Sequence, residues 1–274
     1  MLKTRILTAG IILPLFLSAL FFFQDIFWAI VLLALTVIGS REWSRLAQFS
    51  VRDTIVFMLL TTLLGGELLL QISEAVKFNP LSAELVWIYY VSAIFWIVAA
   101  PLYLKQSFTV TKPWIWMLIG WILLLPTCLA LYQLRSISPL LLLGLMATIW
   151  ISDTAAYFTG RSLGKHKLAP QISPNKTWEG VAGALVAVLI YGLLWIFWSE
   201  EESLGLALVL LLIIMAILGI IGDLYESLVK RQAGVKDSGN ILPGHGGILD
   251  RIDALTSALP FGILAILVFY SPAI

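Results

Sequence analysis

Long apolar runs separated by short polar segments dominate the chain, and this alternation most constrains what it can fold into. Repeated apolar runs of about 18 residues or more are long enough to cross the hydrocarbon of a membrane. Charged residues make up 12 % of the chain, whereas about 25 % is usual for a soluble domain. The sequence therefore predicts an all-α, polytopic membrane bundle of about nine transmembrane helices. The predicted spans are residues 6–23, 26–40, 54–72, 83–104, 113–134, 139–160, 180–199, 204–226 and 254–271.

The distribution of basic residues predicts the orientation of the bundle. If the N-terminus lies in the cytoplasm, 15 of the 17 Lys and Arg residues fall on the cytoplasmic side, and only Lys77 and Arg135 fall outside. This bias agrees with the positive-inside rule. We therefore expect a retained first span, a cytoplasmic N-terminus and an outer C-terminus, with the acidic residues 200–202 also outside. Both long polar loops, residues 161–179 and 227–253, then face the cytoplasm from the inner or plasma membrane.

The cysteine and histidine counts exclude two kinds of site. Cys128 is the only cysteine, so no internal disulfide can form, and one Cys with two His cannot build a Cys/His metal framework. The two halves of the sequence also lack the clear similarity that many secondary transporters have. We divide the chain into residues 1–135, which hold the first five spans, and residues 136–274, a transmembrane region that holds both polar loops and that we expect to carry the function.

The second polar loop begins where span eight ends. If that span continues as a helix, one of its faces carries a series of polar side chains. They are Asp223, Glu226, Ser227, Lys230 and Arg231. Carboxylates followed by Lys and Arg one to two turns later can hold a divalent cation and the phosphates that it bridges. The alternative is an ion-pair network that only solvates the loop.

A Gly-rich turn and a carboxylate pair complete this loop. Residues 243–247 include four Gly or Pro residues, so they cannot be helical, and their backbone can approach a ligand closely. Asp250 and Asp253 follow at the start of the last helix, where the helix dipole favours negative charge. Asp oxygens without Cys suit Mg²⁺ or Mn²⁺ rather than Zn²⁺. Two such ions would clamp a phosphoryl group from both sides.

The first polar loop is basic and also cannot be a continuous helix. Pro170 and Pro174 interrupt it, and Thr177 is the expected N-cap of span seven. Basic groups near a helix N-terminus make a good anion site, although an ordinary loop contacting anionic lipid heads is the alternative. Asp153 lies beside this loop, and we expect it to be functional. Glu67 lies in the third span without a surrounding motif, and we expect it to be structural.

Both polar loops resemble one known family. The stretch HGGILDRID at residues 245–253, together with residues 227–231 and 236–237, looks like the signature of the phosphatidate cytidylyltransferases, or CDP-diacylglycerol synthases. This pattern is long and has fixed spacing, so it is specific. The first loop is similar to the family at Ser152, Asp153, Tyr157, Gly160, Arg161, Gly164, Lys165, Ile172, Ser173, Pro174, Lys176, Thr177, Glu179 and Gly180. The resemblance covers roughly residues 150–260, and the first half matches only as a set of apolar spans.

The resemblance implies a reaction in which CTP and phosphatidic acid give CDP-diacylglycerol and pyrophosphate. The family uses a divalent cation, so we expect one or two Mg²⁺ ions. The lipid phosphate is already an anion and needs no strong general base, so positioning and charge neutralisation carry the catalysis. The expected partners are CTP, phosphatidic acid and membrane lipid, with no nucleic acid. The sequence leaves the oligomeric state open, and a homodimer is one option.

The resemblance and the residue types together suggest roles for individual side chains. We expect Asp223 and Asp250 to bind metal, with Asp253 as a weaker candidate. The residues expected to act in catalysis are Asp223, Asp250, Lys230, Arg231 and His245. The residues expected to bind or orient substrate are Asp153, Ser173, Lys176, Lys236, Asp237, Gly246, Gly247 and Arg251.

Three other classes of protein remain as alternatives. The first is a different membrane phosphotransferase that uses another nucleotide or a polyprenyl phosphate. The second is an anion transporter in which Asp153, Asp223 and Glu67 line a path, although most charge lies in loops rather than at the membrane midplane. The third is a structural or lipid-organising protein, which would have no use for the Gly-rich turn around His245.

Overall fold

The computed structural model describes residues 2–106, 110–199 and 205–270, and these ranges are almost entirely helical. Eight helices in the described ranges are long and apolar enough to cross a membrane, and α1 contains a shorter apolar stretch, Leu7–Phe22. The prediction of an all-α, polytopic membrane bundle is therefore confirmed. The helices are α1 (Leu2–Phe22), α2 (Asp25–Leu46), α3 (Val51–Phe78), α4 (Val86–Ile94), α5 (Ala100–Gln106), α6 (Pro113–Ile137), α7 (Pro139–Leu163), α8 (Trp178–Trp198), α9 (Gly205–Gln232) and α10 (Leu249–Tyr270). A π-helical turn, η1 (Phe95–Ala99), joins α4 to α5 in one continuous helix.

Several helices extend beyond the predicted spans. The second one, α2, continues to Leu46 instead of ending at residue 40, and α3 runs from Val51 to Phe78 instead of over 54–72. Hydropathy marks only the part of a helix that lies in hydrocarbon, while polar residues at its ends reach water or protein partners. The extension of α2 matters most because it places Glu42 inside a helix.

The first polar loop folds into a small β-hairpin, which the sequence analysis did not predict. Strand β1 (Lys167–Ala169) pairs with β2 (Ser173–Thr177) in antiparallel register, with Lys167 opposite Thr177. The prolines do exclude a continuous helix, as predicted. The Thr177 hydroxyl accepts a hydrogen bond from the Gly180 N–H over 3.1 Å, so its predicted role as the N-cap of α8 is confirmed.

The last helix, α10, lies at the centre of the bundle. It packs against α9, α6 and α4, and most of its side chains are buried. The hydrophobic core around it draws residues from both regions of the chain, for example Leu32, Leu129 and Ile263. The start of α10 is therefore held by helices from the first half of the sequence as well as from the second.

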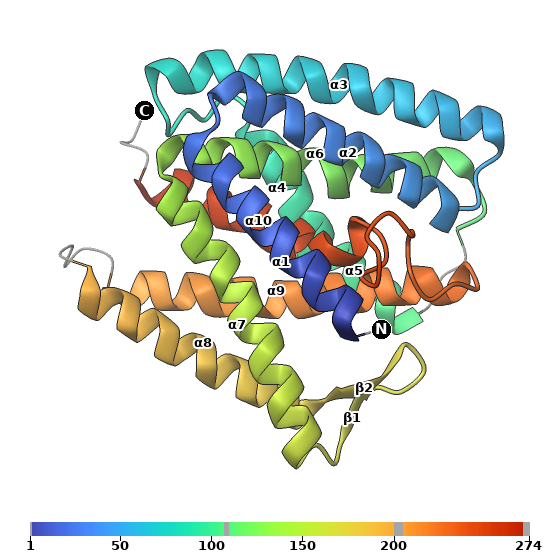
Figure 1. Ribbon diagram of the computed structural model, residues 1–274, viewed down its shortest axis with the longest axis vertical. Coiled ribbons are helices and arrows are strands. Elements are labelled where there is room, and N and C mark those ends of the chain that lie inside the picture. The colour runs from blue at the N-terminus through green and yellow to red at the C-terminus, as the bar shows by residue number, and fades with distance from the viewer. Residues whose placement is uncertain (1, 107–109, 200–204, 271–274) are drawn as a thin grey trace.

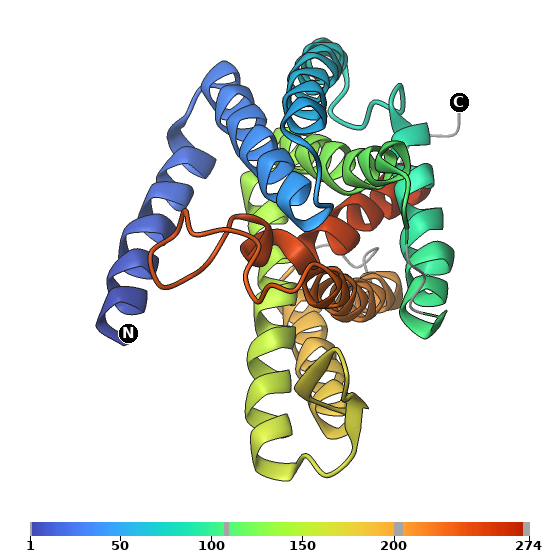
Figure 2. The same cartoon turned by 90° about the vertical axis from the view of Figure 1, so that its right-hand side faces the viewer.

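Both predicted polar loops lie at the same end of the bundle (Figure 1). We call this the loop end, and we call residues 233–248, which join α9 to α10, the α9–α10 loop. Figure 2 looks onto the loop end and shows the loop crossing it between α1 and α9. The Thr8 hydroxyl of α1 donates to the carbonyl of Pro243 over 2.9 Å.

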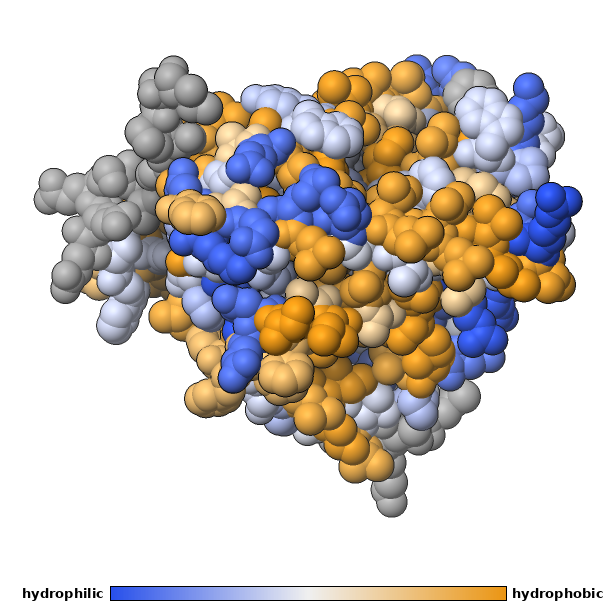
Figure 3. All heavy atoms as spheres, turned by 90° about the horizontal axis from the view of Figure 1, so that it is seen from above, coloured by the Kyte–Doolittle hydropathy of each residue, from blue (hydrophilic) through white to orange (hydrophobic). Residues whose placement is uncertain are grey.

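The surface of the bundle fits a membrane environment. Figure 3 shows a broad apolar area on the side of α3, with hydrophilic residues gathered toward its two ends. Exposed side chains of α3 such as Leu59, Leu63 and Leu70 contribute to this area. Which end faces the cytoplasm stays a prediction. Residues 200–202 and the C-terminal residues 271–274, which we expect on the outer side, lie outside the described residues.

Arg135, one of the two basic residues predicted on the outer side, is buried at the end opposite the loop end. Its Nη1 forms an ion pair with Asp25 Oδ1 at 2.8 Å, and its Nε donates to the Leu20 carbonyl over 2.8 Å. A further hydrogen bond joins Nη2 to the Phe23 carbonyl. Arg135 therefore satisfies carbonyl groups at the C-terminus of α1 that have no partner within that helix.

Candidate active site

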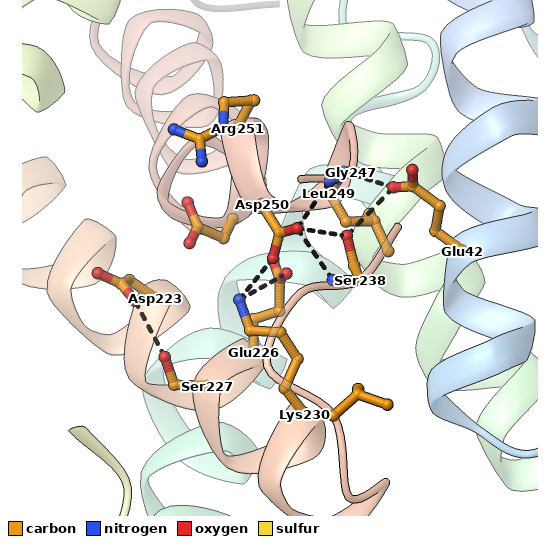
Figure 4. Close-up of polar contacts among 12 residues, drawn as sticks. Glu42, Asp223, Glu226, Ser227, Lys230, Ser238, Gly247, Leu249, Asp250 and Arg251 are labelled. Carbon is orange, nitrogen blue, oxygen red and sulfur yellow. Dashed lines mark hydrogen bonds and ion pairs between the residues drawn. The ribbon is translucent and has the colours of Figure 1, made fainter. Parts of the chain in front are cut away.

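One face of α9 carries the polar side chains that the sequence predicted to lie together. The helix continues to Gln232, so Asp223, Ser227 and Lys230 follow one another at helical spacing toward the loop end. The Ser227 hydroxyl donates to Asp223 Oδ1 over 3.2 Å. Figure 4 shows this face beside the start of α10. The predicted helical continuation is confirmed.

Asp250 accepts hydrogen bonds at both of its carboxylate oxygens. Oδ1 lies 2.7 Å from the Lys230 ammonium, which also pairs with Glu226 at 3.3 Å. Oδ2 accepts hydrogen bonds from the Ser238 N–H at 2.9 Å, the Ser238 hydroxyl at 3.0 Å and the Gly247 N–H at 2.8 Å. The side chains of Asp250 and Lys230 are only 6 % and 10 % exposed. Asp250 thus ties the α9–α10 loop to α9 through a buried ion pair.

The Gly-rich turn of the loop is not helical, as predicted, and two of its glycines have positive φ. Gly244 and Gly246 adopt φ of 76° and 82°, a region that side chains strongly disfavour. A Cβ at Gly246 would also lie 2.6 Å from Asp250 Oδ2. Arg251 donates from Nε and Nη2 to the His245 carbonyl at 2.9 and 2.6 Å. Arg251 therefore fixes the turn, and the residue that pairs with Asp250 is Lys230.

The β-hairpin contacts α9, so the two polar loops form one site. The ammonium of Lys176 on β2 lies 2.5 Å from Asp223 Oδ2. Arg231 Nε donates to the carbonyl of Ile172 over 3.5 Å, a long hydrogen bond. Ser173 begins the same strand as Lys176. The expectation that the bundle could bring the two loops together is confirmed.

Carboxylates from three helices interact electrostatically beside this contact. Asp153 of α7 and Asp253 of α10 both lie within electrostatic range of Asp223, and the Lys176 ammonium also acts on Asp153. Nowhere in the described ranges do three His, Cys, Asp or Glu side chains form a group that could hold a metal ion by themselves. Mg²⁺, however, usually takes one or two carboxylates and completes its shell with water and substrate phosphates. The oxygen-only donors at this end of the bundle therefore fit Mg²⁺ as a substrate-bridging ion.

Some predicted site residues lie near this network without joining it. Lys236 and Asp237 are exposed on the α9–α10 loop, and within the part of the chain that the structure describes they form no hydrogen bond or ion pair. His245 Nδ1 is buried and likewise has no hydrogen-bond partner among those residues. Lys236 and Asp237 thus keep their polar atoms accessible, and the roles of all three residues stay predictions.

Glu42 of α2 is the residue of this site that the sequence analysis missed. It is 2 % exposed, and its carboxylate accepts hydrogen bonds from the Ile248 N–H at 3.1 Å and the Leu249 N–H at 2.8 Å. The Ser238 hydroxyl lies 3.3 Å from the same carboxylate. In the sequence, Glu42 follows Arg41 just beyond an apolar run, which is the usual place of an ordinary flanking charge. Only the fold reveals its partners.

The chain belongs to the cytidylyltransferase family, because a sequence model of that family matches residues 3–269. Two relatives match along nearly the whole chain, and both are named phosphatidate cytidylyltransferase. The protein of Haemophilus influenzae is 35 % identical over 283 residues, which cover 95 % of this chain and 97 % of the relative. The protein of Pseudomonas aeruginosa is 38 % identical over 269 residues, which cover 95 % of each. A Bacillus subtilis protein of the same name is 50 % identical over 113 residues, 41 % of this chain and 42 % of the relative.

Proposed function

We propose that this protein transfers the cytidylyl group of CTP to phosphatidic acid and so makes CDP-diacylglycerol for phospholipid synthesis. A phosphate oxygen of the lipid attacks the α-phosphorus of CTP and forms a new phosphorus–oxygen bond. The bond between the α-phosphorus and the oxygen that joins it to the β-phosphorus breaks, and pyrophosphate leaves with the electron pair of that bond. Support comes from relatives of this name that match 95 % of the chain.

The observation that carries the proposal is the contact between Lys176 and Asp223. This contact joins the hairpin to α9, so that cations and carboxylates from both polar loops lie together at one end of an apolar bundle. Such a place suits a reaction between a water-soluble nucleotide and a lipid. The acyl chains can stay in the bilayer while the lipid phosphate meets CTP at the membrane surface.

Basic side chains supply the phosphate-binding groups in this proposal. Lys176, Arg231, Lys236 and Arg251 come from the hairpin, α9, the α9–α10 loop and the start of α10. Two polyanions repel each other, so positive groups that hold both substrates lower the barrier through positioning and charge neutralisation. Lys230, which pairs with both Glu226 and Asp250, adds positive charge to the same region and keeps Asp250 in place.

We assign Mg²⁺ as the divalent cation, with Asp223 and Asp253 as its protein ligands. When bound, this ion neutralises charge on the phosphates of CTP. Asp250 accepts three protein hydrogen bonds at Oδ2 alone, so we assign it mainly to holding the loop and Lys230. Asp153 lies within electrostatic range of Asp223, and its carboxylate would add to the attraction of this end of the bundle for a cation.

The loop residues complete the proposed site. The backbone around His245, Gly246 and Gly247 lies against the nucleotide phosphates, where the lack of side chains at the glycines allows close approach. Ser173 and Asp237 orient the bound substrates. The site faces the cytoplasm, where CTP is available, and a homodimer is the assembly that we would test first.

The test is pyrophosphate release by the detergent-purified protein given CTP, phosphatidic acid and Mg²⁺. We expect release with CTP, and none with ATP or GTP, without lipid or in the presence of EDTA. Formation of CDP-diacylglycerol in the same reaction, in an amount equal to pyrophosphate, confirms the chemistry. Release with ATP or GTP instead of CTP, or with a polyprenyl phosphate instead of phosphatidic acid, would overturn the assignment. Release that persists in EDTA would overturn the role of the cation.

A further inference from the structure

We infer that Glu42, far from both motifs in the sequence, is a positioning residue that holds the α9–α10 loop and the start of α10 in their active arrangement. The inference rests on the proposed function, because it assigns a part in that reaction to a residue of the first half of the chain. Glu42 touches none of the groups that we assign to the cation or to phosphate. It acts through the backbone of the segment that carries them.

The Glu42 carboxylate binds the N-terminus of α10 from outside that helix. Its two oxygens accept the N–H groups of Ile248 and Leu249, at 3.1 and 2.8 Å. The Leu249 N–H is the first of α10, and the Ile248 N–H directly precedes it, at a helix end where backbone donors have no partner within the helix. A negative charge there is also favoured by the helix dipole. Glu42 thus stabilises this helix end as a capping residue would, but from a neighbouring helix.

Ser238 links Glu42 to Asp250. Its hydroxyl lies 3.3 Å from Glu42 Oε2 and 3.0 Å from Asp250 Oδ2, and its own N–H donates to Asp250. The loop is therefore held between two carboxylates, one from α2 and one from α10 itself. Figure 4 shows Glu42 reaching from α2 toward Ser238, Gly247 and Leu249, on the side away from Lys230.

Two glycines of the loop leave room for this carboxylate. A Cβ at Gly247 would lie 2.6 Å from both oxygens of Glu42, and a Cβ at Gly239 would collide with its Oε1. Neither glycine has positive φ, so neighbouring side chains, and not the backbone conformation, leave no room for a Cβ. The neighbour is Glu42 at Gly239, and at Gly247 it is Glu42 together with the Ser238 hydroxyl, with which the Cβ would collide. The loop is shaped around the carboxylate.

The segment that Glu42 holds carries much of the proposed site. Lys236, Asp237 and His245 lie within the loop, and Asp250 and Asp253 lie in the first turns of α10. A shift of about 1 Å in such groups can cost on the order of 100-fold in rate. Glu42 is thus expected to affect turnover without touching substrate.

The main experiment replaces Glu42 by Gln. The amide keeps the shape of the side chain, but an NH2 group replaces one of the two oxygens that accept backbone N–H groups. This group is itself a donor and cannot bond to the N–H groups of the loop. Glu67→Gln on α3 is the matched control, because Glu67 is exposed and its side chain bonds only to Gln71 among the residues that the structure describes. We expect E42Q to lower kcat roughly 10- to 100-fold and to raise the apparent KM for CTP, whereas E67Q stays within about twofold of wild type.

Hydrogen exchange distinguishes a positioning role from general loss of structure. In E42Q we expect the backbone amides of residues 237–249 to exchange at least about tenfold faster, since hydrogen bonds to a charged acceptor are lost. The backbone amides of the transmembrane helices outside this segment should exchange at the wild-type rate. This measurement needs no substrate, so it still tests Glu42 if the purified protein proves inactive toward CTP and phosphatidic acid. Inactivity of the wild type would instead count against the proposed function.

Gly239→Ala is the second variant, and it guards against a folding defect of E42Q. It changes no charge and removes no polar group, but its Cβ displaces the Glu42 carboxylate. We expect the same loss of kcat and the same local increase in exchange, and Glu42→Asp, which keeps the charge, should recover part of the activity lost in E42Q. Wild-type kcat in both E42Q and G239A would overturn the inference, as would exchange that increases equally in all helices.

Discussion

Two cations are buried at opposite ends of this bundle, and their surroundings differ. Arg135 bonds to two backbone carbonyls and to Asp25. Lys230 lies between the carboxylates of Glu226 and Asp250, one to two helical turns from Asp223. Both charges are costly in an apolar bundle and both are paired.

The difference separates a buried charge that completes a helix end from one that we assign to the proposed site. The partners of Arg135 are the end of one helix and the start of the next, so the arginine completes a helix turn. The partners of Lys230 are carboxylates of a cluster that includes accessible acids and a further lysine. Burial of a charged side chain alone therefore does not indicate a functional site in a membrane protein. Several charged groups gathered around accessible side chains do indicate one.

The largest effect that this comparison predicts is for Asp223→Asn. The variant removes one negative charge from the accessible cluster and the ion pair with Lys176, so we expect pyrophosphate release to fall on the order of 100-fold or more. Because Asp223 is partly exposed, insertion and the thermal midpoint should stay close to wild type. Turnover measured at saturating Mg²⁺ decides the matter, and near-normal activity would remove Asp223 from the site.

Lys230→Met should be nearly as damaging to activity and also reduce stability. It leaves Glu226 and Asp250 buried without their cation, which is strongly destabilising, and it frees Asp250 to shift. We expect turnover to fall roughly 10- to 100-fold together with a lower thermal midpoint. Kinetics and a melting curve on the same preparation check this. A stable and fully active variant would show that Lys230 is needed neither for activity nor, as we expect for Arg135, for stability.

Arg135→Met should separate the two cations most clearly. It removes the hydrogen-bond donor of carbonyl groups at the end of α1 and leaves Asp25 without its cation, so we expect a lower thermal midpoint. Specific activity of the folded fraction should stay within about twofold, because the change lies at the far end from the site. Size-exclusion chromatography followed by kinetics on the monodisperse fraction tests this. A large loss of turnover per folded molecule would show that the two ends are coupled.

Lys77→Ala should have the smallest effect. Lys77 is exposed, and within the described part of the chain it pairs only with Glu74, one turn away on α3. Such surface pairs contribute little to stability. Activity should remain within about twofold of wild type. A strong loss would contradict the predicted topology, in which Lys77 lies on the outer side.

The sequence predicted most of the fold and much of the site from local patterns. Apolar runs marked the helices, Pro170 and Pro174 marked a break, and Thr177 marked a helix start. The polar face of α9 followed from helical spacing alone. What local patterns could not give were contacts between distant segments. The pairing of Lys176 with Asp223 and the hydrogen bonds of Glu42 depend on how the helices pack.

The same limit explains the individual misses. The hairpin was not predicted because its strands are only 3 and 5 residues long, too short for an alternating pattern to stand out. The ends of α2 and α3 were placed too early because charged residues can continue a helix past the hydrocarbon. The role of Asp250 as a metal ligand stays a prediction, and its hydrogen bonds with Ser238 and Gly247 were not foreseen because the sequence does not reveal where their backbone lies.

The contact between Glu42 and Leu249 joins residues that are 207 positions apart, and this separation sets the order in which the protein matures. A chain is inserted from its N-terminus onward, so α2 is in the membrane long before α10 has been synthesised. During that time Glu42 has no partner, and the α9–α10 loop has nothing to fold against. The proposed catalytic end can be completed only when the last helix docks, so we expect shorter nascent chains to be inert toward nucleotide and lipid.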